Sequence, residues 1–236
     1  MKIGITERGD AAIHGKEVVK TLINGSFDGA ILITKDAALL RAYLPQLREI
    51  MPGNLIVHCT ITGFGGTVLE PGIKPAEEQL KAYHRWVKDL GPENVVLRID
   101  PIIPTEKGVA RAVDVAKHAE SRVRVSFIDQ YPHVIERFNR LGAKLPWNTF
   151  HAPTQMRLDA YDDVNSVVGI QVEICGEPGF YCTGCVSYRD FDAMGLYEPC
   201  GKLGGQRSMC QCLVEKTEIL AFRGQCRHKC AYCYWK

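Results

Sequence analysis

The 236-residue chain has little net charge, no long apolar run and no apolar leader, and each absence excludes a class of protein. Lysine and arginine number 29 and aspartate and glutamate 27, so the net charge of +2 indicates neither a nucleic acid nor a membrane as partner. No apolar run approaches the ~18 residues that a membrane span needs. The first eight residues, MKIGITER, contain no apolar core of the kind found in signal peptides. We therefore expect a cytoplasmic protein that does not enter a membrane.

Cysteine is nearly missing from the first 174 residues, where it occurs only as Cys59. The remaining cysteines all lie from Cys175 onward. A cysteine-rich end on an otherwise cysteine-poor body is typical of metal binding rather than of disulfides. We interpret Cys59, inside an apolar segment, as a small buried hydrophobic residue. The glycine-rich segment 63–66 has neither the lysine nor the spacing of a phosphate-binding loop.

Apolar segments typical of strands alternate with helical patterns at intervals of roughly 30 residues. The strands are apolar on both faces, as sheets covered by helices require, so we expect parallel βα units in a TIM-like barrel or a doubly wound sheet. Strands are predicted at 2–6, 30–34, 55–62, 94–99, 122–128 and 169–174, with Asp100-Pro101 ending the fourth. Helices are predicted at 16–23, 36–47, 75–90, 109–119, 134–141 and 155–161.

Polar side chains occur where the predicted strands end. In parallel βα folds the reactive groups lie at the carboxyl ends of the strands, so these side chains are expected to line one mouth. They are Arg8, Thr34, Lys35, Arg98, Asp100, Ser126, Asp129 and Glu173.

Three cysteines near the carboxyl end, Cys226, Cys230 and Cys233, are spaced C-x3-C-x2-C, with Tyr232 directly before the third. Three thiolates on one short loop can each bind one iron of a [4Fe–4S] cube, and the fourth iron then has no ligand from the loop. Zinc is the alternative, but zinc knuckles favour C-x2-C pairs and need four ligands. His228 lies inside the loop, yet no second pair is dedicated to it. The spacing therefore favours a cluster over zinc.

This tail resembles the signature of the radical SAM superfamily. Members bind S-adenosylmethionine to the open iron and cleave it reductively to a 5′-deoxyadenosyl radical, so the resemblance implies the same chemistry here. In that superfamily the motif follows the first barrel strand, whereas here it ends the chain. The resemblance therefore implies a circularly permuted barrel, in which a last strand at 217–222 lies beside the strand at 2–6.

The whole chain also resembles an uncharacterised family related to spore photoproduct lyase. The matching motifs are Arg8 with Asp10, Thr34-Lys35, RIDPI at 98–102, SFID at 126–129, and Gln206-Arg207 ahead of Cys210 and Cys212. The residues that the resemblance assigns to cofactor binding are Tyr232, Arg8, Arg98, Asp100, Ser126 and Glu173. It also implies an electron donor such as flavodoxin or ferredoxin. Because spore photoproduct lyase acts on thymines in DNA, a lyase or isomerase acting on a thymine-type nucleobase is one expectation, and a small metabolite is another substrate.

A second group of cysteines lies in a segment rich in glycine and proline, which needs a cross-link because it cannot bury much apolar surface. Its members are Cys175, Cys182, Cys185, Cys200, Cys210 and Cys212. The resemblance implies that Cys175, Cys210 and Cys212 hold an auxiliary [4Fe–4S] cluster, with Cys185 as fourth ligand and Cys182 as its competitor. Structural zinc is the alternative, because Cys182 and Cys185 have zinc-knuckle spacing.

These patterns together predict an α/β, TIM-like partial or full barrel with an irregular cysteine-rich C-terminal segment. The barrel body covers residues 1–174, the auxiliary metal segment 175–213, and the final strand with the cluster loop 214–236. The rival interpretation is a non-catalytic zinc- or iron–sulfur-binding module or an electron carrier. An iron–sulfur protein is brown and a zinc protein is colourless, so colour distinguishes metal types.

Overall fold

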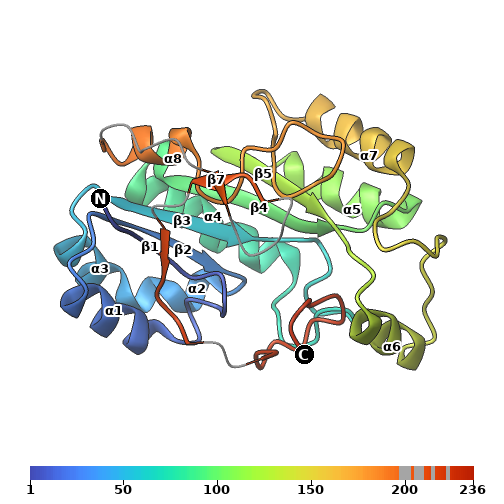
Figure 1. The fold of residues 1–236 in the computed structure, drawn as a ribbon, viewed down its shortest axis with the longest axis horizontal. Helices are drawn as coiled ribbons and strands as arrows, with labels where there is room; N and C mark the ends of the chain where they lie inside the picture. Colours follow the sequence, from blue (N-terminus) through green and yellow to red (C-terminus); the bar gives the residue numbers. More distant parts are fainter. Residues whose placement is uncertain (197–202, 205–209, 214–215, 222–223) are drawn as a thin grey trace.

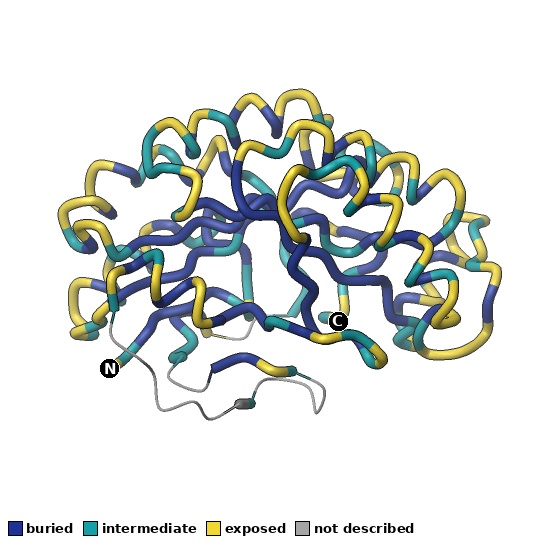
Figure 2. Tube along the Cα trace, turned by 90° about the horizontal axis from the view of Figure 1, so that it is seen from above, coloured by how far each residue is buried: buried dark blue, intermediate teal, exposed yellow. Residues whose placement is uncertain are grey.

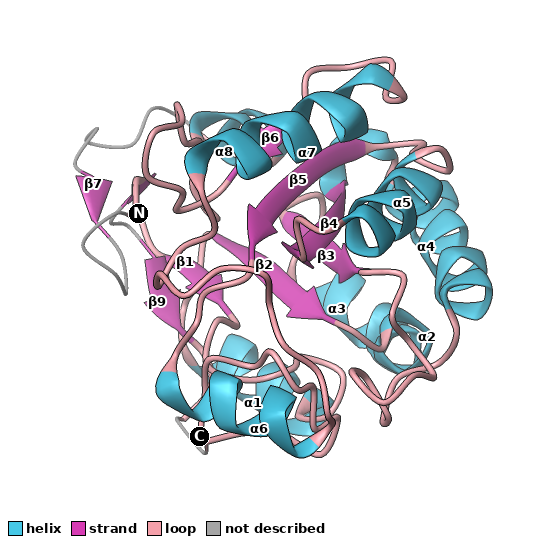
Figure 3. Ribbon diagram, turned by 90° about the vertical axis from the view of Figure 1, so that its right-hand side faces the viewer, coloured by secondary structure: helices cyan, strands magenta, loops and turns pink. Residues whose placement is uncertain are grey.

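The computed structural model describes residues 1–196, 203–204, 210–213, 216–221 and 224–236. Within these residues, parallel strands form one curled sheet with the shape of a half-barrel (Figures 1 and 3). The strand order is β6-β5-β4-β3-β2-β1-β9. Its strands are β1 (Ile3–Ile5), β2 (Gly29–Thr34), β3 (Leu55–Thr60), β4 (Val95–Ile102), β5 (Arg122–Phe127), β6 (Glu173–Ile174) and β9 (Lys216–Glu218). The mixed α/β prediction is confirmed, and the sheet is compatible with a partial TIM-like barrel.

Helices alternate with the strands, as the sequence pattern predicts. They are α1 (Gly15–Asn24), α2 (Ala37–Leu40), α3 (Leu44–Ile50), α4 (Ala76–Leu90), α5 (Glu106–Ala116), α6 (Pro132–Arg140), α7 (Thr154–Ser166) and α8 (Tyr188–Ala193), with 3-10 turns at Arg41–Tyr43 and Pro92–Asn94. The predicted helix at 36–47 is divided because a 3-10 turn separates α2 from α3, and α3 restarts with Pro45 in its first turn, where a missing N–H costs nothing.

Several strand boundaries differ from the prediction. β4 does not end before Asp100-Pro101 but continues to Ile102, with a shift in register between Ile99 and Ile102. β6 is shorter than predicted and contains only Glu173 and Ile174. The last strand, predicted at 217–222, is β9 at Lys216–Glu218, and residue 222 lies outside the described part.

The outer face of the sheet is covered by helices α1–α5 and α7, which pack around one apolar core. This core includes Leu32, Val57 and Leu97 from the sheet and Trp86 from α4, all fully buried. Cys59 belongs to it, as predicted for a small hydrophobic residue. Figure 2 shows the consequence: most of the strand residues are buried, and exposure alternates along the covering helices. Burial on both faces explains why the strand sequences are continuously apolar.

The inner face of the half-barrel packs against the cysteine-rich segment and α8. Ile5, Ile31 and Val96 point to this side, where they meet Phe191 of α8 and Cys185. A third core lies at the carboxyl ends of the strands, where α6 contacts the C-terminal loop. The cysteine-rich segment also carries an antiparallel pair, β7 (Leu203–Gly204) with β8 (Cys212–Leu213).

The C-terminal strand pairs with the N-terminal one. β9 runs parallel to β1, with Ile3 opposite Lys216 and Ile5 opposite Glu218, and the amide of Ile219 donates to the carbonyl of Ile5 at 2.8 Å. The residues after β9 therefore emerge at the carboxyl ends of the strands, where the C-terminal loop lies (Figure 1). In the described part, no helix is long and apolar enough to span a bilayer.

Candidate functional site

A pocket opens at the carboxyl ends of the strands and collects residues from most of the sheet. Six of the eight predicted strand-end residues line it: Thr34, Lys35, Arg98, Asp100, Ser126 and Asp129. The other two predicted residues, Arg8 and Glu173, do not line the pocket. Arg8 is exposed, and Glu173 is buried among arginines elsewhere on the inner face. Six cysteines line the same pocket: Cys175, Cys185, Cys210, Cys226, Cys230 and Cys233.

The loop that carries the tail cysteines rests on the loop between β3 and α4. The amide of Ala231 donates to the carbonyl of Leu69 at 2.9 Å, and the amide of Gly72 donates to the carbonyl of His228 at 3.2 Å. A Cβ on Gly72 would stand 2.7 Å from the Cα of His228. Glycine is therefore needed at this position for the two backbones to approach so closely.

Helix α6 and the segment that follows strand β1 hold the other side of the tail. Arg137 donates to the carbonyls of Cys233 and Trp235 at 2.5 and 2.7 Å, and an imidazole nitrogen of His133 lies 2.9 Å from the carbonyl of Tyr234. The hydroxyl of Tyr234 donates to the carbonyl of Glu7 at 3.2 Å. These contacts fix the backbone of the tail from Cys233 onward.

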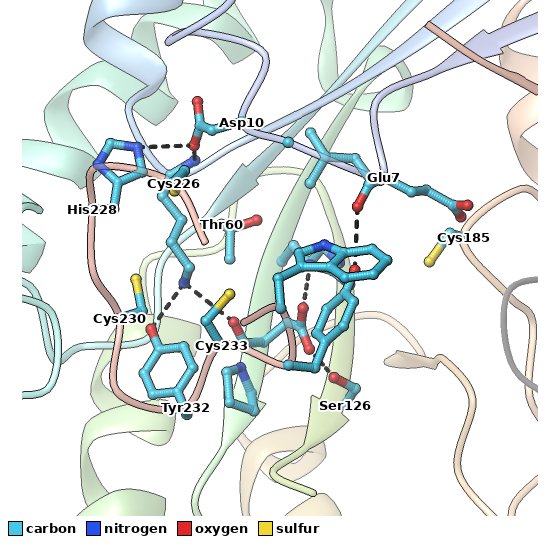
Figure 4. A pocket seen from close by; sticks show the side chains of 18 of the residues that line it. Glu7, Asp10, Thr60, Ser126, Cys185, Cys226, His228, Cys230, Tyr232 and Cys233 are labelled. Atoms are coloured by element: carbon cyan, nitrogen blue, oxygen red, sulfur yellow. Dashed lines mark hydrogen bonds and ion pairs between the residues drawn. The ribbon is translucent and has the colours of Figure 1, made fainter. Parts of the chain in front are cut away.

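The three tail thiols surround one space at the side of the pocket (Figure 4). Burial raises the pKa of the Cys226 and Cys233 thiols, and it raises the pKa of Cys230 to about 12. Without a metal the loop thus favours neutral thiols. A bound metal cation would reverse this preference, because a coordinating thiol is deprotonated outright.

Lys35 places a positive charge next to these thiols. Its ammonium donates to the Glu70 carboxylate at 2.8 Å, the Tyr232 hydroxyl at 3.0 Å and the Asp100 carbonyl at 3.3 Å. Burial opposes the charge, but Glu70 and Cys230 outweigh it and raise the pKa of Lys35. Glu70 itself is fully buried and also accepts from the Thr62 hydroxyl at 2.8 Å. The sequence carries no signal for Glu70, since it lies in an irregular loop.

His228 turns away from the thiols. Its Nε2 lies 3.2 Å from the Asp10 carboxylate and its Nδ1 lies 3.3 Å from the carbonyl of Gly72 (Figure 4). Asp10 is further held by the hydroxyl of Thr34 at 2.7 Å and the amide of Lys35 at 2.6 Å. The Nε2 atom lies within ion-pair distance of Asp10 but has no hydrogen bond of good geometry, whereas Nδ1 has the carbonyl of Gly72 as its partner. The imidazole is thus directed toward Asp10 and Gly72.

The floor of the pocket carries a polar triad from β4 and β5. Arg98 pairs with Asp100, and the Ser126 hydroxyl donates to the same carboxylate. Burial disfavours the guanidinium charge, but Asp100 and the thiols of Cys185 and Cys175 raise the pKa of Arg98 further. Arg98 thus pairs with the Asp100 carboxylate and is also near enough to Cys175 and Cys185 to interact electrostatically with them.

The second group brings together four of its described cysteines on the inner face. The Sγ atoms of Cys175 and Cys185 lie 3.1 Å apart, the amide of Cys185 donates to the Sγ of Cys212 at 3.1 Å, and the Cys212 thiol contacts that of Cys210. Cys182 does not join them, because its Sγ lies between the amide and the carbonyl of Glu177 at 3.1 and 3.3 Å. Cys200 lies outside the described residues.

Glu173, predicted to bind a cofactor, belongs to a buried ion-pair network. Its carboxylate pairs with Arg122 at 2.9 Å and with Arg124, and Asp190 of α8 pairs with Arg122 at 2.9 Å and with Arg124 at 3.3 Å. Arg124 also donates to the carbonyl of Cys185 at 3.0 Å. The network therefore holds the backbone of the second cysteine group through Arg124. Its residues do not line the pocket.

Comparison with known proteins identifies one family. The sequence profile of a domain of unknown function, DUF1848, matches residues 11–235. No curated protein matches the chain significantly. Because the match covers nearly the whole chain, including both cysteine groups and every strand except β1, the protein belongs to the DUF1848 family.

Proposed function

We propose that this protein is a radical SAM enzyme whose [4Fe–4S] cluster is held by Cys226, Cys230 and Cys233. Such a cluster, when bound, supplies the electron that cleaves S-adenosylmethionine to a 5′-deoxyadenosyl radical, which abstracts a hydrogen from the substrate. The observation that carries the proposal is the composition of the tail site. It offers three thiols around one space, and His228, the remaining metal-binding side chain of the loop, is turned to Asp10 and Gly72.

The donor set favours a cluster over a zinc ion at this site. Structural zinc needs four ligands within one tetrahedron. Among the described residues, the tail thiols do not form a set whose ligand atoms all lie within 4.8 Å of one another. Thiolates on three different irons are separated by the body of the cube, so a wider spacing is what a cluster requires.

The chain's own residues prepare the site in three ways. Lys35 balances the charge of the thiolates, held in place by Glu70 and by the Tyr232 hydroxyl. Arg98, Asp100 and Ser126 present charged and polar groups on the pocket floor, where the polar parts of S-adenosylmethionine would bind. Tyr232, which lines the pocket, would contact the bound cofactor. Arg8 and Glu173 lie away from the pocket, so we assign them no contact with the cofactor.

The position of β9 supports the proposal that the barrel is circularly permuted. β9 lies parallel to β1 and delivers the cysteine loop to the carboxyl ends of the strands, the place that a first strand with its cluster loop would take. We propose flavodoxin or ferredoxin as the electron donor. The substrate we propose is a thymine-type nucleobase in DNA or a nucleotide, because aromatic side chains of Tyr131, Tyr234 and Trp235 line the pocket and provide faces for stacking a flat ring.

The test is production of 5′-deoxyadenosine. Protein purified anaerobically, reduced and incubated with S-adenosylmethionine should release 5′-deoxyadenosine, and Cys230→Ala should abolish the release. Cys182→Ala is the matched control, because Cys182 is a buried thiol outside the pocket, and it should leave the release intact. Release that persists in Cys230→Ala would contradict the assignment, and colourless protein without iron would favour the non-catalytic metal-binding module.

A further inference from the structure

The two cysteine groups differ in how closely their sulfur atoms approach, although both line one pocket. In the second group, Cys175 and Cys185 have their Sγ atoms 3.1 Å apart, and the ligand atoms of Glu7, Cys185 and Cys212 all lie within 4.8 Å of one another. Cys175 and Cys210 are not members of this compact group, but Cys212 contacts the thiols of both. The three tail thiols, by contrast, form no such compact set within the described residues.

This difference distinguishes one metal ion from a cube. Four thiolates at ~2.3 Å around one tetrahedral zinc ion lie about 3.8 Å from each other. Thiolates bound to different irons of a [4Fe–4S] cluster are held apart by the whole cube, so sulfur atoms nearly in contact do not suit them. The described cysteines form no disulfide, so a covalent S–S bond does not explain the approach either.

We infer that Cys175, Cys185, Cys210 and Cys212 form a mononuclear site that binds one zinc-type ion through four thiolates. It goes beyond the proposed function, because it depends only on the second cysteine group and holds whether or not the tail carries a cluster. For the second cysteine group, the inferred metal is thus zinc and not an auxiliary [4Fe–4S] cluster.

The surroundings of the site fit a four-thiolate ion, which carries a net negative charge. Three cations lie close enough to interact with its sulfur atoms: Arg98 with Cys175 and Cys185, Arg124 with Cys185, and Lys216 with Cys212 and Cys185. The Glu7 carboxylate beside the site is bound by the Lys216 ammonium at 2.8 Å. Glu7 is therefore occupied by a cation, and the four thiols supply the ligands.

The chain path explains why Cys185 joins the site and Cys182 does not. Gly184 has φ +79°, and a Cβ there would stand 2.9 Å from the backbone of Cys212. This turn brings Cys185 against Cys212, while Cys182 remains on the side of Glu177. Glycine is required at the turn both for its positive φ and for the close approach.

The site also links the two edges of the half-barrel. Cys175 directly follows β6, at one edge, and Cys212 lies in β8, shortly before β9 at the opposite edge. A metal ion between them joins both edges through a segment that is short of regular structure. Structural zinc contributes to the free energy of folding in such segments. The ion therefore stabilises the half-barrel by cross-linking its two edges.

Metal and sulfide analysis of the full chain tests the inference. The wild-type protein, purified anaerobically and measured for zinc, iron and acid-labile sulfide, should contain about one zinc ion per chain. Cys185→Ser and Cys212→Ser should lose the zinc, whereas Cys182→Ser, the matched control two residues from the turn, should retain it. A variant lacking the tail thiols, C226S/C230S/C233S, should also retain it and should bind neither iron nor sulfide.

A second measurement covers the case in which the cysteine variants do not fold. Wild-type protein loaded with Co²⁺ in place of zinc should show the visible absorption of a tetrahedral four-thiolate ion. Iron and sulfide that remain bound in C226S/C230S/C233S would overturn the inference in favour of an auxiliary cluster, as would a wild-type chain that takes up neither Zn²⁺ nor Co²⁺. Absence of iron from the wild type would refute the proposed function alone, so the two failures are distinguishable.

Discussion

Replacing Lys35 by Met should destabilise the protein by leaving Glu70 without its cation. The ammonium lies 2.8 Å from the Glu70 carboxylate, and the side chains are 17% and 1% exposed. Removing one partner of a buried pair costs about 3–5 kcal/mol because the other charge stays buried. Lys35 retains some contact with solvent, so we expect the lower end, about 3 kcal/mol. For a chain of this size that corresponds to a fall in melting temperature of about 6–12 °C.

The double variant K35M/E70Q separates this penalty from the role of the lysine charge. The glutamine side chain that replaces Glu70 is neutral and can still accept from the Thr62 hydroxyl, so the double variant should regain at least about half of the lost stability. Its iron content after anaerobic purification should stay below that of the wild type, because the tail thiolates still lack their neighbouring cation. Thermal unfolding and iron analysis measure the two effects. A double variant as unstable as Lys35→Met would refute the electrostatic reasoning.

Three further predictions concern the contacts of the tail and the ion-pair network. Gly72→Ala should cost about 1–3 kcal/mol and weaken iron retention, because the added Cβ meets the backbone of His228, whereas Gly169→Ala, with open space around it, should be neutral in both measurements. Arg137→Met should clearly lower iron retention with only a small loss of stability, because two carbonyls of the tail lose their hydrogen-bond donor. Iron retention equal to that of the wild type would contradict this. Burial opposes the charge of Asp190, but its arginine partners hold the pKa of this carboxyl group well below the usual range. The stability that these ion pairs provide is therefore present above the unfolded-state pKa of about 4, and it is lost as the pH falls below that value. In Asp190→Asn the acid-side slope of stability should flatten, and an unchanged slope in acid titration would count against the network.

The sequence was sufficient to predict the parallel βα order and the gathering of polar strand ends. Continuous apolar runs indicate a sheet covered on both faces, and in such a sheet the strand ends meet at one edge. Lys35, Arg98 and Ser126 therefore line the pocket as predicted. The placement of the last strand beside the first was also predicted, and β9 pairs with β1.

What could not be predicted depends on contacts between distant segments. Glu70 lies in a loop without periodicity, so no pattern marks it as the partner of Lys35. Cys182 and Cys185 form one C-x2-C pair, so the sequence offers either of them as a metal ligand. Only the turn at Gly184, which brings Cys185 against Cys212, distinguishes the two. Glu173 follows the rule for strand ends, but two arginines on the adjacent strand capture its carboxylate within the inner core. The position of Glu173 at a strand end was therefore not sufficient to predict its role, because its ion pairs with the two arginines hold it inside the core.

The tail site is assembled from contacts that are very far apart in the chain. Tyr234 binds the Glu7 carbonyl across 227 residues, His228 contacts Gly72 across 156, and Arg137 binds the Cys233 carbonyl across 96. Each anchor comes from a different part of the chain, namely the segment after β1, the β3–α4 loop and α6, so the shape of the loop depends on all three. The metal binding proposed for the tail would therefore be linked to folding, because ligands that come together only in the folded state add their binding free energy to folding.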